Sequence, residues 1–164
     1  MKLKLVFIAL IMVIVVRVSL AEGSGRWIYE KITDDVTQQE VSTATVRSNN
    51  TIHLFYPYNG VNHGLIMIRK VKSTEAEVLF AVDKGIFYTG DKIRVTFDGG
   101  NADWVTVNKP SDRRNDLLFI DNPKNFIRQI KNAKQVKVAA QFSQNGEKVL
   151  DFDVEGLDLT KVGL

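Results

Sequence analysis

The sequence predicts a mainly β protein: a single-domain antiparallel β-sandwich-like fold with one late α-helix, preceded by a signal peptide. Three observations support this fold class. Short runs of apolar and β-branched residues recur along the chain at a spacing of roughly 8–12 residues, as in sandwiches and barrels. Gly, Asn and Asp lie between these runs, where tight turns need them. One segment in the last third instead repeats its apolar residues at helical spacing.

Turn-forming residues separate the predicted strands. Ser48-Asn49-Asn50 is one such turn, and the runs before and after it predict a hairpin. Pro57 ends the strand after this turn, because proline has no N–H to donate to a sheet. Asn145-Gly146 predicts a second hairpin near the end of the chain. The predicted strands span Trp27–Ile32, Val41–Arg47, Thr51–Tyr56, Leu65–Lys72, Glu77–Val82, Ile93–Phe97, Trp104–Val107, Leu117–Ile120, Val136–Phe142 and Lys148–Val154.

The late helix is predicted to begin at Pro123, with Asp121 or Asn122 as its N-cap. Its apolar side is expected to hold Phe126, Ile127, Ile130 and Ala133. Its other side is basic and is the only positive cluster that the sequence pattern predicts in the mature chain. That side is either the solvated face of an amphipathic helix or a surface for anionic lipids or wall polymers. The basic residues are Lys124, Arg128 and Lys131, followed by Lys134 and Lys137.

Residues 1–21 have the three parts of a secretory signal peptide. Lys2 and Lys4 precede an apolar run of 12 residues, Leu5–Val16, and small residues precede a cleavage site after Ala21. The alternative is an uncleaved membrane anchor. As a helix the run would span only about 18 Å, against about 30 Å of bilayer hydrocarbon. We therefore expect a signal peptide at 1–21 and one β-rich domain at 22–164, exported to the periplasm or the extracellular space of a bacterium.

Removal of this leader changes the charge of the chain. The full sequence has 22 basic and 19 acidic residues, and the leader contains three of the basic residues and none of the acidic ones. The mature chain is therefore balanced, which argues against a nucleic-acid partner, since such partners need a basic domain. Cysteine is absent, which excludes thiol catalysis, thiolate metal sites and disulfides.

Residues able to support catalysis or metal binding are few. The sequence has two histidines, His53 and His63, too few to predict a zinc site, and no G-x-S-x-G motif. Asp98, Asn101 and Asp103 could offer oxygen ligands to calcium, but they lack the EF-hand pattern and fit a tight turn equally. The sequence thus predicts no enzyme, no cofactor and no metal, with these three residues as weak candidates.

The strongest candidates for a binding surface lie in Phe55–Gly60, because tyrosines combine apolar area with a polar tip and are common at interfaces. In the alternative, Tyr56 belongs to the core with Ile52 and Leu54, and Tyr58 only covers the end of the sandwich. The candidate binding residues are Tyr56, Tyr58, Asn59, His63, Arg113 and Arg114.

Six segments occur in an order that resembles a family of small exported bacterial proteins. They are SNNTIHLFYPYNG, LIMIRK, FAVDKGIF, IRVTFDGG, LLFIDNPKNFIRQIKNAKQVKV and VLDFDVEGL, which carries a C-terminal F-x-V-x-G-L motif. Phages and prophages also encode members, most of them uncharacterised. The family is distantly similar to the TagO-like proteins associated with type VI secretion, and the resemblance spans roughly Trp27 to Leu157. It implies a β-sandwich-like fold with a late helix and supplies no catalytic residues. Relatives often have a cysteine pair where this chain has Gly85–Arg94 without cysteine.

These observations together predict an exported, non-enzymatic binding module of the bacterial envelope, with a possible link to phages or to a secretion system. Its expected partner is an envelope protein or a glycan, and it would meet a membrane only through an uncleaved leader. The alternative is a cation-dependent or hydrolytic enzyme that acts on cell-wall material.

Overall fold

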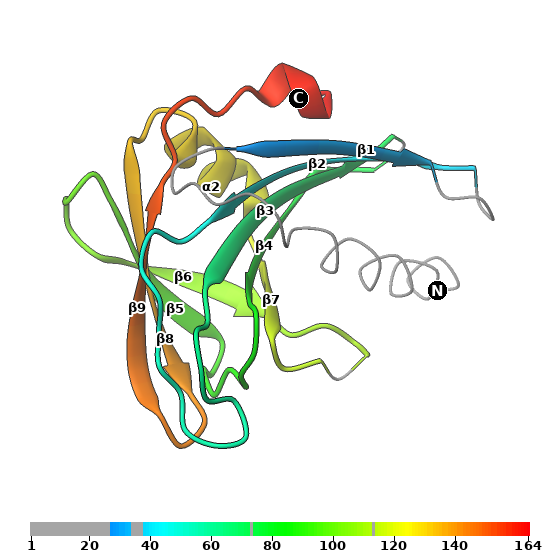
Figure 1. Cartoon of the computed structure of the whole chain (residues 1–164). Helices are drawn as coiled ribbons and strands as arrows, with labels where there is room; N and C mark the ends of the chain where they lie inside the picture. The colour runs from blue at the N-terminus through cyan, green and yellow to red at the C-terminus, as the bar shows by residue number, and fades with distance from the viewer. Residues whose placement is uncertain (1–26, 34–37, 73, 113) are drawn as a thin grey trace.

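The computed structural model describes residues 27–33, 38–72, 74–112 and 114–164. These residues form one antiparallel sheet of nine strands in the order β1-β2-β3-β4-β7-β6-β5-β8-β9 (Figure 1). The predicted mainly β, antiparallel fold class is confirmed, whereas the predicted signal peptide lies outside the described residues. The strands are β1 (Ile28–Thr33), β2 (Glu40–Arg47), β3 (Gly64–Val71), β4 (Glu77–Val82), β5 (Lys92–Phe97), β6 (Asp103–Asn108), β7 (Leu117–Ile120), β8 (Gln135–Phe142) and β9 (Gly146–Asp153).

The sheet folds over on itself, so that its two halves face each other across the main core (Figure 1). The half made of β1–β4 and β7 contributes Phe80, whose ring lies 6.3 Å from the ring of Phe152 in β9. The edges of the folded sheet are joined by side chains. The indole Nε1 of Trp27 donates to the carbonyl oxygen of Val154 at 2.9 Å, and Asn50 exchanges hydrogen bonds with the backbone of β9. A single sheet thus produces the two packed layers of a sandwich.

Residues 51–56 do not form the predicted strand, and the predicted hairpin around Ser48–Asn50 is wrong. β2 pairs instead with β1 and β3, while Ile52 makes an isolated bridge to Asn62. Ile52 and Leu54 are buried as the alternation predicts, because this extended loop lies on the end of the core. An extended loop on a core buries every second residue just as a strand does, so alternation alone does not distinguish the two.

The late helix, α2 (Pro123–Ile130), begins where the sequence predicts. The Oδ1 atom of Asn122 accepts a hydrogen bond from the N–H of Asn125 at 3.1 Å, which makes Asn122 the N-cap. Phe126 and Ile130 are buried against the sheet. On the basic side, Lys124 forms an ion pair with Glu75 at 2.7 Å, so part of the predicted positive stripe carries its own counterion.

A short 3₁₀ helix, η2 (Leu159–Val162), lies near the C-terminal end of the chain (Figure 1). Val162 is buried in the main core, and the hydroxyl of Tyr29 in β1 accepts a hydrogen bond from the N–H of Asp158 at 2.7 Å. These contacts hold η2 over β1–β3. Within the described residues, no helix has the length and apolar character needed to cross a membrane.

Candidate functional site

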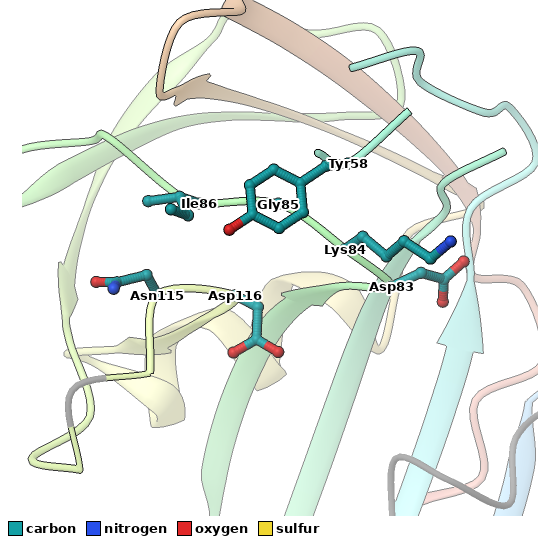
Figure 2. A pocket seen from close by; sticks show the side chains of 7 residues that line it. All are labelled: Tyr58, Asp83, Lys84, Gly85, Ile86, Asn115 and Asp116. Carbon is teal, nitrogen blue, oxygen red and sulfur yellow. The ribbon is translucent and has the colours of Figure 1, made fainter. Parts of the chain in front are cut away.

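Three loops meet at the end of the sheet where β2 ends and β3 begins, which we call the loop end. The loops follow β2, β4 and β6, and the turn between β8 and β9 lies beside them. They enclose an open cleft of about 450 Å³ (Figure 2). Its lining residues are Tyr58, Asp83, Lys84, Gly85, Ile86, Asn115 and Asp116.

Backbone hydrogen bonds on both sides hold the floor of the cleft, residues 83–86. The N–H of Asp83 donates to the carbonyl of His63 at 3.0 Å, and the N–H of Ser143 donates to the carbonyl of Ile86 at 2.9 Å. Gly85 has φ = +128°, and a Cβ atom there would lie 2.8 Å from Leu54 Cδ1. The floor can therefore pass this close to the core only because residue 85 is a glycine.

Asn62 holds the Tyr58 wall of the cleft. Its side chain is fully buried, and its Nδ2 atom donates to the carbonyl oxygens of Tyr58 at 2.9 Å and of Gly60 at 3.1 Å. The N–H of Tyr58 donates to the carbonyl of Phe55 at 3.0 Å. Sequence reasoning did not single out Asn62, although an asparagine between turn glycines is a recognisable signal for a side chain that caps a loop.

Both carboxylates of the cleft already have basic or backbone partners. Asp83 accepts hydrogen bonds from Arg47 Nη2 and from the N–H of His63, each at 3.0 Å. Asp116 accepts two from Arg114, at 3.0 and 2.8 Å, and this hydrogen-bonded pair raises the pKa of the Arg114 guanidinium. The cleft is therefore equipped with fixed charges and hydrogen-bonding groups suited to recognition.

Three aromatic side chains at the loop end are exposed to solvent. Phe55, Tyr56 and Tyr88 are 70%, 85% and 75% exposed. Hydrogen bonds from their N–H groups place Phe55 and Tyr88 near the β8–β9 hairpin: the N–H of Phe55 donates to Asn145 Oδ1 at 2.7 Å, and that of Tyr88 to the carbonyl of Gln141 at 2.8 Å. Tyr88 was not among the predicted binding residues; its one signal is its position next to Phe87, which is buried.

The structure brings three of the six predicted binding residues to the cleft. Tyr58 lines it, and His63 and Arg114 bind its two carboxylates through a backbone N–H and a guanidinium. Asn59 is exposed in the same loop and does not line the cleft. The interpretation that Tyr56 belongs to the core is wrong, because this side chain points into solvent. Arg113 lies outside the described residues.

The candidate calcium ligands have a different arrangement. Asp98 occupies the turn between β5 and β6 with φ = +49°, and its Oδ1 accepts the N–H groups of Lys134 at 2.7 Å and Gln135 at 2.8 Å. These backbone hydrogen bonds, the one from Gln135 first, lower the pKa of Asp98. The described residues contain no group of three or more His, Asp or Glu side chains placed to hold a metal, and one carboxylate oxygen of Asp98 is occupied by these two backbone N–H groups.

In its described part, the molecule thus presents a polar cleft with fixed ion pairs and a margin of exposed aromatic rings, an arrangement suited to holding a partner. The chain matches no protein-family model, no curated protein and no solved structure.

Proposed function

We propose that this protein is an exported, non-enzymatic binding module of the bacterial envelope, and that its loop end holds an envelope protein or a glycan. One observation carries the proposal: Phe55, Tyr56 and Tyr88 stand exposed beside an open cleft, on segments tied to the sheet framework. Solvent-exposed aromatic rings in such numbers at one end of a domain are typical of recognition surfaces.

The chemistry of the loop end suits a partner with both apolar and hydroxyl or amide groups. The faces of aromatic rings carry partial negative charge and attract the weakly positive C–H groups of sugar rings and aliphatic side chains. Lys84, Asn115 and the Tyr58 hydroxyl can supply hydrogen bonds from within the cleft. Because the loops are fixed before binding, little conformational entropy is lost when a partner is bound.

The composition of the cleft supports binding without catalysis. Among its described lining residues none is Ser, Cys or His, and both carboxylates are engaged with arginines. General acid–base or nucleophilic chemistry needs a group that is free to exchange a proton or attack. The resemblance to exported bacterial and phage-encoded proteins, together with the leader-like first 21 residues, supports an envelope setting with a phage or secretion-system association.

Site-specific photo-cross-linking in intact envelopes tests this proposal. A photoreactive residue in place of Tyr88 should give a discrete adduct, while the same residue in place of Lys131, the residue that follows α2, should not. A Tyr56→Ala, Phe55→Ala variant should lose most of the adduct formed from position 88. An identical adduct from both positions would contradict the proposal. Release of soluble fragments from purified wall material by the protein would favour the enzymatic alternative instead.

A further inference from the structure

A second cleft lies at the other end of β2 and β3, between these strands, β1 and η2. Its volume is about 230 Å³. It is formed where η2 passes over the three strands near the C-terminal end of the chain (Figure 1). We call it the lysine cleft, because Lys31, Lys70, Lys72 and Lys161 line it together with Ser42 and Glu40.

The register of the sheet sets the spacing of these lysines. Ser42 in β2 pairs with Lys31 in β1 on one side and with Lys70 in β3 on the other, so the three side chains share one face. Because the Ser42 side chain is small, it leaves a hollow between the long side chains of Lys31 and Lys70. Lys161 of η2 and Lys72, which follows β3, add two further ammonium groups at the margin.

The charges of this cleft are not balanced from within. Among the described residues, four lysines and one acidic residue, Glu40, line it, which leaves a net charge of three positive units; the ammonium group of Lys70 donates to the backbone carbonyl of Thr74. Glu40 pairs with Lys31 at 2.8 Å, and Lys161 lies over the ring of Tyr29 at 4.6 Å from its centroid. Among the described residues, Lys72 has no acidic side chain within ion-pair distance. On α2, by contrast, Lys124 is exposed to solvent and has Glu75 as its partner.

We propose that the lysine cleft binds a phosphate group. A tetrahedral phosphate accepts hydrogen bonds from several directions, which matches a cleft lined by lysines of β1, β3 and η2 and by the hydroxyl-bearing Ser42 of β2. Its negative charge offsets the mutual repulsion of the lysines, and a concave site focuses their field. A volume of 230 Å³ is several times the ~30 Å³ share of one water molecule, so the phosphate can enter with part of its carrier.

The carrier can be a small phosphate compound or the headgroup of an anionic lipid, and two titrations distinguish these sources. In the first, inorganic phosphate is added to the isotope-labelled protein at constant ionic strength set by chloride, and amide NMR shifts are followed. In the second, the protein is mixed with vesicles of phosphatidylcholine containing or lacking phosphatidylglycerol. We expect saturable shifts at Ser42, Lys70 and Lys161 with free phosphate. Binding only to the vesicles with phosphatidylglycerol, through the same lysines, would assign the phosphate to a lipid.

Three variants make the test specific. Lys70→Gln with Lys72→Gln should weaken phosphate binding by about tenfold or more, because two of the donors are removed. Glu40→Gln should strengthen binding severalfold, because it removes the one acidic side chain among the described lining residues and releases Lys31. The matched control, Lys124→Gln with Lys131→Gln, makes the same change in net charge in α2 and the residue that follows it, and should leave binding unaltered.

The proposal is overturned if neither titration saturates, or if the α2 control weakens binding as much as the cleft variant. Weaker binding by Glu40→Gln would also overturn it. Because Glu40→Gln is a single substitution expected to increase binding, it remains informative even if the double lysine variant fails to fold. Thermal unfolding of each variant establishes that the comparison is between folded proteins.

Discussion

Asn62 is a buried amide on which the Tyr58 wall of the cleft depends. Asn62→Ala removes hydrogen bonds to the carbonyls of Tyr58 and Gly60, and we expect it to lower the free energy of unfolding by about 1–3 kcal/mol. Part of the loss is offset because the Oδ1 atom of Asn62 has no partner among the described residues. Urea unfolding measures the effect.

The matched control for Asn62 is Asn59→Ala, in the same loop but exposed. Its effect should stay within about 0.5 kcal/mol. The Asn62 variant should also reduce cross-linking from position 88 if the Tyr58 wall contributes to partner binding. Equal stability losses for the two variants would show that the buried amide does not hold the loop.

Gly85 is the residue at which the cleft floor comes closest to the core. Gly85→Ala places a side chain at φ = +128°, in a region that only glycine occupies readily, and also brings its Cβ against Leu54. We expect a loss of about 1–3 kcal/mol of stability. Gly90→Ala is the control, because a Cβ there has no atom within 4 Å. Similar unfolding midpoints for the two variants would contradict this prediction.

At the scale of elements, Asp98 joins the β5–β6 turn to the start of β8 through two backbone hydrogen bonds. These bonds lower the pKa of the Asp98 carboxyl below its ordinary value of 3.8. A carboxyl group whose pKa is lower in the folded than in the unfolded state contributes its full stabilisation at pH values above its unfolded-state pKa. The contribution is then lost as the pH falls from about 3.8 through the folded-state pKa.

Asp98→Asn keeps an acceptor and tolerates the positive φ of this position, but it cannot titrate. We expect the variant to be less stable than the wild type at pH 7, and the difference to shrink as the pH falls below about 3.8. Other carboxyl groups with lowered pKa values, Glu75 and Asp158, are shared by both proteins and cancel in the difference. Asp103→Asn is the control, and a pH-independent difference for Asp98→Asn would contradict the assignment.

Elements with a complete local signal could be predicted from the sequence. The helix α2 has a capping asparagine, a proline at its first position and a single apolar side, all within a few residues. The β8–β9 hairpin has the Asn145-Gly146 turn, with Gly146 at φ = +69°, and buried residues that alternate along both strands. The segment 51–56 alternates like a strand but makes a single bridge, from Ile52 to Asn62, and its hydrogen bond from Phe55 goes to Asn145, 90 residues further along the chain.

The candidate sites, too, could be predicted only where a local sequence signal marks the residue. Tyr58, His63 and Arg114 could be selected by residue type, but only the folded chain shows that two carboxylates, Asp83 and Asp116, join them around one cleft. The lysine cleft could not be predicted at all. Its lysines come from β1, β3 and η2, and they become neighbours only through the strand register and the path of the C-terminal segment.

At the scale of the whole molecule, the two clefts lie at opposite ends of the same strands. Arg47 at the end of β2 and Gly64 at the start of β3 are at the loop end, whereas Ser42 and Lys70 belong to the lysine cleft. The parts of β2 and β3 between the two clefts are packed against the main core. Interactions at sites this far apart without shared partners are usually additive.

We therefore expect the two binding activities to be independent. Lys70→Gln with Lys72→Gln should weaken phosphate binding by about tenfold or more without changing the adduct formed from position 88. Tyr56→Ala with Phe55→Ala should remove most of that adduct without changing phosphate binding. Combining the four substitutions should give the sum of the separate effects, within about 0.5 kcal/mol. If the lysine variant also removed the cross-linked adduct, the two ends would have to be parts of one extended surface for a single phosphate-bearing partner.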